Sequence, residues 1–371
     1  MKVRYPLHFA FWKAVYKQDK NRILFADPYA TDLTDNMKPL WAALEKRDGL
    51  TLVKCFPQTA GLSGNSLAGK IKGRANRASA FDRFIREYAR AGTVFLTESY
   101  LPAYAVAART GTQVVQLWHA SGAFKKWGYS TLDKSFGASD DRIPMHNCYT
   151  LVPVSSAEVA PCYADAFRCD PSVIKPLGVP RTDELFDQNT DTKAELVKEH
   201  PKLAGKKLIL YAPTFRGNNV VDAKAAEMPD FSKLDSSYAV LLRMHPFVKG
   251  KYEIPEECKG VILDTSDYDT NFCLRAADIL ITDYSSIIFE YSLLDKPMVF
   301  FAPDLDSYRD NRDFYYNYED FVPGPIAKNT EELLEALASP PDLKRVKDFR
   351  NKYMSACDGH ATEKIIKELL G

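Results

Sequence analysis

The chain has 371 residues, of which 46% are hydrophobic, enough for two ordinary domains that each bury a core. No apolar run reaches the about 18–20 residues that cross a bilayer, and the first residues lack the long apolar segment of a signal peptide. The seven cysteines are scattered without a close pair, which favours reduced thiols in a cytoplasmic protein over disulfides or a zinc site.

The formal net charge is zero, but the charges are unevenly distributed. Residues 1–180 contain 24 Lys and Arg against 15 Asp and Glu, a net of +9, and residues 181–371 contain 25 against 34, a net of −9. The basic half predicts an anionic partner, either nucleic acid or an anionic membrane surface.

The strongest basic segment is residues 70–90, which contain seven basic and two acidic residues. Its apolar residues recur at helical spacing and give the segment one apolar face: Phe81, Phe84, Ile85 and Tyr88. That face can pack inward against the protein, or it can lie on anionic lipid with the aromatic side chains inserted. The run at 9–17 combines aromatic residues with lysine and could join the same surface.

Strand-like runs rich in Val, Ile and Leu alternate with helical stretches along the whole chain. We expect strands at 22–26, 50–56, 93–97, 113–118, 149–154 and 173–177, then at 207–212, 238–244, 260–263, 278–282 and 297–301. The alternation predicts an α/β protein with two Rossmann-like domains, 1–178 and 179–371, facing a cleft in the GT-B arrangement. The boundary is placed at 178–181, where Gly and Pro interrupt the chain.

A histidine marks the end of the predicted strand at 113–118. His119 follows Trp118 there and could take a proton from an attacking hydroxyl. Lys125 and Lys126 come soon after, within reach of an anionic group. The alternative is a histidine that bonds a loop carbonyl, with both lysines in solvent.

Two strand ends in the second half carry residues suited to a diphosphate. Arg243 and His245 follow one strand, and Asp283, Ser285 and Ser286 follow another. Ligands of open parallel sheets bind at the carboxyl ends of strands, and the serines would open a helix whose free N–H groups favour phosphate. The alternative is that the serines only cap the helix and His245 is packed.

Other polar residues extend this predicted site. Thr214 and Arg216 follow the strand at 207–212, and Arg216 could clamp a phosphate bidentately. Glu290 lies one turn after Ser286 and could accept from ribose hydroxyls or pair with a lysine. Asp304 and Asp306 resemble a DxD metal motif, a pattern also common in loops, so a divalent metal is not indicated.

These residues resemble the signature blocks of the CDP-glycerol glycerophosphotransferases, the primases and polymerases of teichoic acids and related polymers. The blocks are Trp118-His119 with Lys125-Lys126, Tyr211 to Arg216, Arg243 to Pro246, Thr282 to Ser286, Asp295-Lys296-Pro297, Gly178 to Asp183 and Asp358-Gly359. The chain departs from the family's frequent Trp-His-Gly-Thr-Pro, since Ala120, Ser121 and Gly122 follow His119.

The resemblance implies a GT-B phosphotransferase without a cofactor and without a bound metal. His119 and His245 would be its catalytic residues, with His119 as the base on the acceptor hydroxyl. Trp118, Lys125 and Lys126 would bind the acceptor. The CDP-glycerol or related CDP-polyol donor would meet Thr214, Arg216, Arg243, His245, Asp283, Ser285, Ser286 and Glu290.

The implied acceptor is a hydroxyl of a prenyl-diphosphate-linked saccharide or of a growing polyol-phosphate chain. This acceptor places the protein peripherally on the cytoplasmic face of the cell membrane, and the resemblance implies no nucleic-acid partner. The short chain favours a primase or a short-polymer enzyme. Three alternatives stay open: transfer of ribitol phosphate from CDP-ribitol, sialic acid transfer from CMP-sialic acid, and a non-enzymatic protein that binds nucleotides or nucleic acid.

Overall fold

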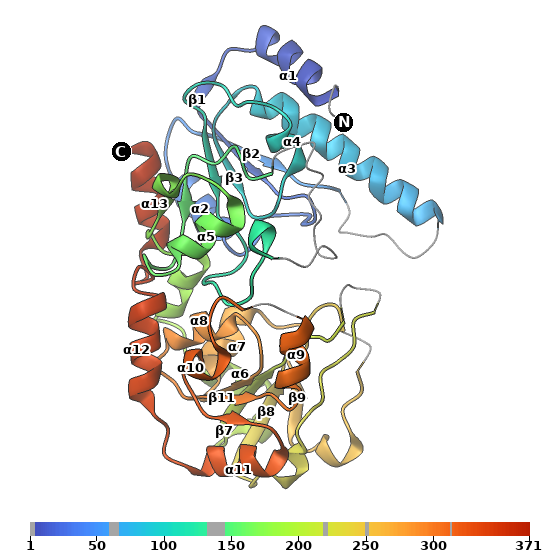
Figure 1. Ribbon diagram of the computed structural model, residues 1–371, viewed down its shortest axis with the longest axis vertical. Helices are drawn as coiled ribbons and strands as arrows, with labels where there is room; N and C mark the ends of the chain where they lie inside the picture. Colours follow the sequence, from blue (N-terminus) through green and yellow to red (C-terminus); the bar gives the residue numbers. More distant parts are fainter. Residues whose placement is uncertain (1–3, 59–66, 132–144, 218–221, 249–251, 312–313) are drawn as a thin grey trace. The chain divides into compact units, whose positions relative to one another are not determined.

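The structure is a computed structural model that describes residues 4–58, 67–131, 145–217, 222–248, 252–311 and 314–371 (Figure 1). The chain forms two compact units. Unit 1 comprises Met1–Ser121, Trp127–Asp183 and Ala356–Gly371, and unit 2 comprises Gly122–Lys126 and Glu184–Ser355.

Unit 1 is built on a parallel sheet of four strands in the order β2-β1-β3-β4. The strands are β1 (Asp19–Ala26), β2 (Thr51–Cys55), β3 (Ala91–Leu96) and β4 (Gln113–Gln116). A parallel pair, β5 (Val152–Pro153) and β6 (Ile174–Lys175), follows, and a bridge between Val115 and Leu151 connects β4 to it. The order reverses direction between β1 and β3, and such a switch point is where open α/β sheets bind ligands.

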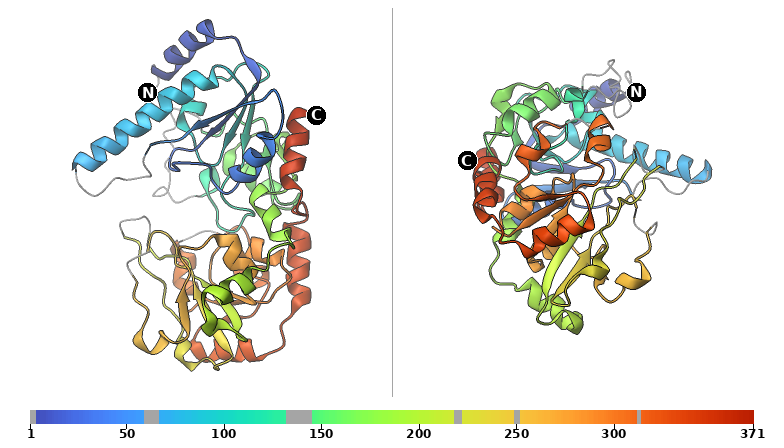
Figure 2. Two further views of the ribbon diagram at one scale, coloured as in Figure 1. Left: turned by 180° about the vertical axis from the view of Figure 1, so that it is seen from behind. Right: turned by 60° about the horizontal axis from the view of Figure 1, so that its bottom comes forward.

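The helices of unit 1 cover this sheet. They are α1 (Arg4–Val15), α2 (Met37–Leu44), α3 (Leu67–Tyr88), α4 (Leu101–Tyr104), α5 (Ala160–Phe167) and the C-terminal α13 (Ala361–Leu370). Helix α13 packs beside α2 (Figures 1 and 2), and its Ile365 and Ile366 join a buried cluster with Phe25 and Leu40. The end of the chain therefore supplies part of the core of the first unit.

Unit 2 contains six parallel strands in the order β12-β11-β10-β7-β8-β9. They are β7 (Lys207–Ala212), β8 (Tyr238–Leu242), β9 (Ile262–Asp264), β10 (Ile279–Thr282), β11 (Met298–Phe301) and β12 (Ile326–Ala327). This order is that of a dinucleotide-binding fold, with the switch point between β7 and β10.

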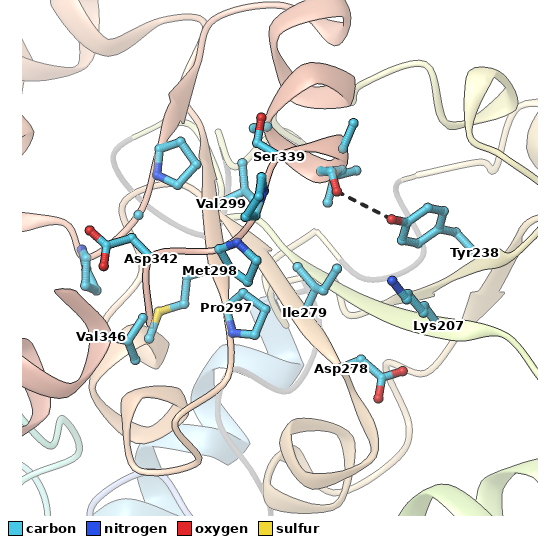
Figure 3. Close-up of a pocket in the computed structure, with 18 of the residues that line it drawn as sticks. Lys207, Tyr238, Asp278, Ile279, Pro297, Met298, Val299, Ser339, Asp342 and Val346 are labelled. Carbon is cyan, nitrogen blue, oxygen red and sulfur yellow. Dashed lines mark hydrogen bonds between the residues drawn. The ribbon is translucent and has the colours of Figure 1, made fainter. Parts of the chain in front are cut away.

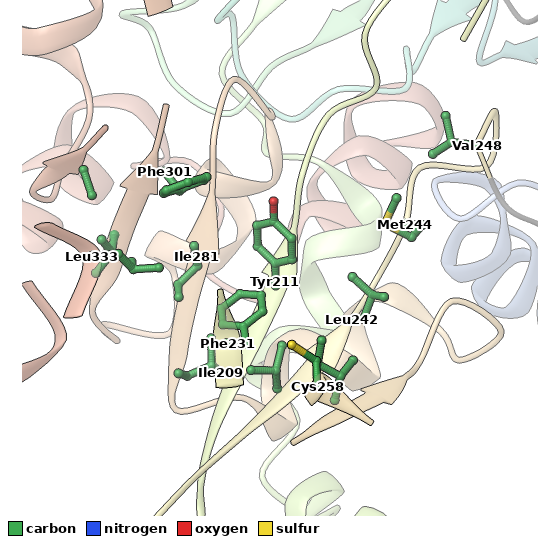
Figure 4. Close-up of a cluster of buried hydrophobic side chains, with 14 of the residues drawn as sticks. Ile209, Tyr211, Phe231, Leu242, Met244, Val248, Cys258, Ile281, Phe301 and Leu333 are labelled. Atoms are coloured by element: carbon green, nitrogen blue, oxygen red, sulfur yellow. The ribbon is translucent and has the colours of Figure 1, made fainter. Parts of the chain in front are cut away.

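The helices of unit 2 are α6 (Thr192–Glu199), α7 (Thr270–Ala276), α8 (Ile287–Ser292), α9 (Leu305–Asn311), α10 (Tyr318–Phe321), α11 (Thr330–Ala338) and α12 (Leu343–Tyr353). One core cluster lies against the strands (Figure 4), where Tyr211, Leu242 and Ile281 pack with Phe231 and Leu333. This apolar packing holds the strands whose carboxyl ends carry the polar residues described below.

All eleven strands expected from the sequence are present, with ends shifted by a few residues, and β12 is an additional short strand. The expected division into 1–178 and 179–371 needs correction in two places. The unit boundary falls after Asp183, and the chain crosses between units at Gly122–Lys126 and again at Ala356–Gly371. A single cut cannot describe such a chain.

The interpretation of residues 70–90 as a lipid-inserted helix is also corrected. Phe84, Ile85 and Tyr88 of α3 are fully buried within unit 1, and Phe81 is partly buried and packs edge-on against Tyr100. Helix α1 covers part of this face, since Phe9 stacks near Tyr88 at 5.5 Å between ring centroids. The side chains of residues 70–74 and 77 lie outside the described residues. The apolar face of α3 is therefore core, as the alternative interpretation held.

Candidate active site

The candidate donor site begins at the switch point of unit 2, where a buried carboxylate joins two strand ends. Asp283 follows β10, is 2% exposed, and accepts hydrogen bonds from the backbone N–H and hydroxyl of Thr214, which follows β7. The distances are 2.8 and 3.1 Å. Asp283 and Thr214 therefore hold the two strand ends together, and their polar atoms are occupied by each other.

Arg216 is also held by carboxylates and joins the contact between Asp283 and Thr214. Its guanidinium donates to both carboxylate oxygens of Asp304, at 2.6 and 3.0 Å, and to Asp283 at 2.9 Å. Burial alone would lower the pKa of Arg216, but its hydrogen bonds to Asp304 and the charges of both carboxylates raise it above its ordinary value. Burial also acts to raise the pKa of Asp304, and Arg216 outweighs that effect, so the pKa falls below its usual value. A direct phosphate clamp by Arg216 would require this bidentate pair to open.

His245 lies beyond the end of β8 in a partly apolar environment. The rings of Phe215 and Phe247 lie 4.7 and 4.8 Å from its imidazole, between centroids. Burial, and then the positive charge of Lys125, lower the pKa of His245 to about 4, so the ring is neutral near pH 7. The backbone N–H of Phe247 donates to Nδ1 at 3.2 Å, which leaves the proton on Nε2. His245 thus offers an N–H donor to an anionic ligand.

Lys125 belongs to unit 2 in the structure, although the sequence associated it with the acceptor. Its residue pairs with Phe314 in an antiparallel bridge, and its ammonium lies 5.2 Å from the ring centroid of Tyr308. Its charge acts on His245. Lys125 and His245 therefore supply a cation and a neutral donor to the same unit. Lys126 is partly exposed beside it.

Ser285 and Ser286 are partly exposed and lead into α8. Ser286 occupies the N-cap position without a side-chain capping bond, and the hydroxyl of Ser285 accepts from the backbone N–H of Ile287 at 3.3 Å. Glu290 lies one turn further and is 3% exposed. The serines are placed to donate to a ligand, whereas contact between Glu290 and a ribose stays a prediction.

Arg243 has a different environment from the one expected for a phosphate ligand. Its guanidinium donates to the carbonyl of Tyr268 and to the hydroxyl of Thr270, both at 2.6 Å. These bonds tie the end of β8 to the loop before α7. The observed partners of Arg243 therefore belong to the protein, and a direct contact between Arg243 and the donor phosphate stays a prediction.

In unit 1, His119 follows β4 and is about half exposed. Its Nδ1 lies 2.8 Å from Oε1 of Glu98, which follows β3, and the side chains are 53% and 28% exposed. The indole of Trp118 stacks on the imidazole at 4.2 Å between centroids. Trp118 itself is 8% exposed and has a φ of 56°, a left-handed conformation that costs about 1–3 kcal/mol in a residue other than glycine. Such conformations persist where surrounding contacts impose them, often at functional sites.

Three further residues fix this strand end, and none of them is among the site residues predicted from the sequence. The side chain of Gln116 accepts from the backbone N–H of Trp118 at 3.0 Å, and Asn36 donates to the Trp118 carbonyl at 2.9 Å. Arg181 donates to the carbonyl of His119 at 2.9 Å. Arg181 lies inside the motif block Gly178 to Asp183, and that block is the signal that could have identified it. Glu98 directly follows a predicted strand, so the expectation that ligands bind at the carboxyl ends of strands applied to this residue as well.

Asp183 belongs to the motif block Gly178 to Asp183 and shows what this block does. Its carboxylate accepts from the backbone N–H groups of Ala361 and Thr362, at 2.9 and 2.8 Å, at the start of α13. Gly178 has a φ of +90°, and a Cβ there would meet the carbonyl of Ala356 at 2.6 Å. This block fastens the returning C-terminal segment to unit 1.

The expectation that the DxD-like pair Asp304 and Asp306 binds no metal stays a prediction. Asp304 of the DxD-like pair is taken by Arg216, and the described residues contain no group of three His, Cys, Asp or Glu side chains that could hold a metal. The same described residues contain no helix long and apolar enough to cross a membrane.

A cavity of about 1030 Å³ lies at the other edge of the unit 2 sheet (Figure 3). Lys207 begins β7, Asp278 precedes β10 and Met298 begins β11, so this cavity is at the amino ends of the strands. The candidate donor residues follow the carboxyl ends. The cavity is therefore separate from the candidate active site.

Two Rossmann-like units with polar strand ends, one carrying a histidine–carboxylate pair and the other phosphate-type donors, fit a nucleotide-dependent transferase. The sequence profile of the CDP-glycerol:poly(glycerophosphate) glycerophosphotransferases matches residues 8–371, and the chain belongs to this family.

Similar sequences include enzymes for two polyols. A teichoic acid ribitol-phosphate primase of Bacillus spizizenii is 35% identical over 93% of this chain and 90% of its own length. The teichoic acid ribitol-phosphate polymerase TarL of Staphylococcus aureus is 39% identical over 80% of this chain and 55% of its length. A teichoic acid glycerol-phosphate primase of Bacillus subtilis is 30% identical over 74% of this chain and 72% of its length. The family is therefore that of polyol-phosphate transfer in teichoic acid synthesis.

The fold is similar to that of the wall teichoic acid polymerase TagF, with a TM-score of 0.76 and 21% identity over 99% of this chain and 93% of the solved chain. This similarity confirms the predicted GT-B fold of two α/β units with parallel sheets.

Proposed function

We propose that the protein transfers a polyol phosphate from a CDP-polyol to a hydroxyl of a membrane-linked acceptor and releases CMP. The observation that supports this most directly is the pair of histidines in complementary settings. His119 lies beside a carboxylate, and His245 is a neutral donor on which the charge of Lys125 acts.

The proposed reaction is an in-line displacement at phosphorus. The acceptor hydroxyl gives its proton to Nε2 of His119 and forms a bond to the distal phosphorus of the donor. The bond from that phosphorus to the bridging oxygen breaks, and CMP leaves with the bonding electrons. His245, the two serines and Lys125 stabilise the phosphate charges, since positioning and charge neutralisation provide most of the catalysis in phosphoryl transfer.

For the donor, we propose ribitol phosphate ahead of the glycerol phosphate expected from the motifs. The support is similarity: the ribitol-phosphate primase matches over 93% of the chain at 35% identity, and the glycerol-phosphate primase over 74% at 30%.

Turnover with different donors tests this proposal. CMP release would be measured with CDP-ribitol, CDP-glycerol and CMP-sialic acid, each with the same lipid-linked saccharide acceptor. We expect release and polyol incorporation with CDP-ribitol, slower turnover with CDP-glycerol and none with CMP-sialic acid. Faster turnover with CDP-glycerol would reverse the donor assignment, and no turnover with either CDP-polyol would contradict the function.

We also propose peripheral attachment to the cytoplasmic face of the cell membrane, now through α1 in place of α3. The outward face of α1 exposes Leu7, Phe11 and Val15, which follow one another at helical spacing and are 66%, 57% and 52% exposed. Lys13 is exposed on the same helix, and the first turn has no acidic residue. An apolar stripe with basic neighbours suits an anionic bilayer surface.

Sedimentation with liposomes tests this attachment. We expect binding to anionic vesicles that high salt only partly releases, and loss of binding when Leu7, Phe11 and Val15 are each replaced by Ser. A matched triple replacement of the exposed Lys46, Arg47 and Asp48 by Ser should leave binding intact. Equal binding by both triple variants would rule out α1 as the attachment site.

A further inference from the structure

The carboxylate of Glu98 is the strongest unassigned feature next to the proposed chemistry. It lies 2.8 Å from Nδ1 of His119, close enough for a charge-assisted hydrogen bond. The two residues follow neighbouring parallel strands, β3 and β4, whose carboxyl ends lie at one sheet edge.

Gln116 sets the spacing of this pair from both sides. Its amide nitrogen donates to the carbonyl of Glu98 at 3.2 Å, and its amide oxygen accepts from the backbone N–H of Trp118 at 3.0 Å. Gln116 is fully buried, and its amide nitrogen also donates to the hydroxyl of Tyr149 at 2.7 Å. Each end of the amide is thus committed, so the backbone of Glu98 and that of the residue before His119 are held by one side chain.

A second brace fixes the residue just before Glu98. The hydroxyl of Thr97 donates to Asp27, at the end of β1, at 2.6 Å. On the other strand, Asn36 and Arg181 hold the carbonyls of Trp118 and His119. An exposed ion pair on a protein surface is usually weak and has no such surrounding bonds. Here, hydrogen bonds hold the backbone next to both Glu98 and His119.

We propose that Glu98 is a positioning residue that makes His119 a base. A carboxylate at Nδ1 accepts a hydrogen bond from the N–H of that nitrogen, which leaves the lone pair of Nε2 available to the acceptor hydroxyl. When that hydroxyl gives up its proton, the imidazolium forms beside a negative charge that stabilises it. The inference rests on the proposed role of His119 and assigns the residue that sets its tautomer.

Steady-state kinetics of Glu98→Gln provide the first test. The amide keeps the shape but removes the charge, and its NH₂ can donate to Nδ1, which moves the imidazole proton to Nε2. We expect kcat to fall about 10- to 100-fold, the fold-change that corresponds to losing a hydrogen bond to a charged group, with the KM for the CDP-polyol unchanged. Glu98→Asp should recover part of kcat because it restores the carboxylate. Glu45→Gln, an exposed glutamate of the same unit that accepts from Trp41, is the matched control and should keep full kcat.

The tautomer is read directly from nitrogen-15 NMR of the labelled histidine rings at alkaline pH, with the His119 signals assigned by their loss in His119→Asn. We expect the proton on Nδ1 in the wild type and predominantly on Nε2 in Glu98→Gln. A shift of tautomer separates this role from a purely structural one.

The outcomes distinguish the inference from the proposed function. If His119→Asn keeps full turnover, the function of His119 as base is wrong. If His119→Asn is inactive but Glu98→Gln has normal kcat and the wild-type tautomer, only the inference is wrong. A fall in kcat accompanied by a lower melting temperature and an unchanged tautomer would also overturn it, since Glu98 would then only stabilise the fold.

Discussion

The two histidines of the candidate site have opposite surroundings, and these predict opposite roles. His119 faces a carboxylate at Nδ1, whereas Nδ1 of His245 accepts a backbone N–H. The proton therefore lies on Nδ1 in one ring and on Nε2 in the other. The first ring presents a lone pair and the second presents a donor, so the same residue type is fitted for a base in unit 1 and for phosphate binding in unit 2.

The two sheets that carry these histidines share a structural feature, a hydrogen bond between an aspartate and a threonine at neighbouring strand ends. In unit 1 a buried aspartate, Asp27, accepts from Thr97 across the switch point, and in unit 2 Asp283 accepts from Thr214 in the same way. The residues that follow the two threonines differ. Glu98 comes next in unit 1 and meets a histidine, whereas Arg216 in unit 2 pairs with Asp304. The comparison indicates that similar strand ends acquire their chemistry from the next one or two residues.

The largest expected effect comes from removing the base. His119→Ala should reduce turnover by about 10²–10⁴, the range for a positioned general base, with donor affinity unchanged because the donor residues belong to unit 2. Turnover would be followed by CMP release and affinity by calorimetry. His360→Ala, an exposed histidine of unit 1 whose side chain is 64% exposed, is the control and should behave as wild type. Normal turnover in a folded His119→Ala protein would remove the contrast between the two histidines.

The next effect concerns the donor side. His245→Ala, and separately Ser285→Ala combined with Ser286→Ala, should each weaken CDP-polyol binding about tenfold to a hundredfold, since hydrogen bonds to a charged group contribute about 1.5–3 kcal/mol. Calorimetry measures the affinity, with His360→Ala as the control, because His360 is an exposed histidine of unit 1. Unchanged affinity in both variants would place the diphosphate elsewhere.

Sequence patterns predicted the strands and the polar residues at their ends because both are local features. Val-rich and Ile-rich runs such as β7 and β10 are recognisable in isolation, and the strand-end rule then identifies His119 and His245. The partners of those residues come from distant positions. Asp304 lies 88 residues from Arg216, and no local pattern distinguishes a guanidinium that binds phosphate from one paired with a carboxylate.

The apolar face of α3 illustrates a second limit. Phe84, Ile85 and Tyr88 have the same spacing whether they contact lipid or protein, so periodicity alone left both interpretations open. The deciding fact is that α1 and the sheet of unit 1 cover that face. The return of α13 to unit 1 was equally hidden, because it depends on Asp183 bonding a helix start far along the chain.

A smaller effect would sharpen the role of Arg216. Asp304→Asn keeps the shape but weakens the bidentate pair. If Arg216 serves mainly to brace the strand ends, this variant should lower the melting temperature and weaken donor binding several-fold, because partly buried ion pairs leave a costly unpaired charge when one partner is removed. If Arg216 instead binds phosphate directly, Asp304→Asn should strengthen donor binding by releasing it. Thermal unfolding and calorimetry distinguish the two, and Asp306→Asn, an exposed neighbour, is the control.

The smallest expected effect is the pH dependence of donor affinity. Burial first, and the charge of Lys125 second, lower the pKa of His245 to about 4, so the ring should stay neutral across about pH 5–8, where an ordinary histidine changes charge. CDP-polyol affinity in the His119→Ala background should therefore be constant over this range.

The free energy of unfolding should depend on pH in the opposite direction from that of a protein whose histidine is paired with a carboxylate. Because the folded pKa lies below the unfolded value of about 6.5, the neutral ring favours folding fully above about pH 6.5, and this contribution is lost as pH falls toward 4. His245→Asn should flatten the fall in unfolding free energy over that window. An affinity that rises as pH falls through about 6.5 would mean that His245 binds the diphosphate as a cation, and the contrast with His119 would then lie in position alone.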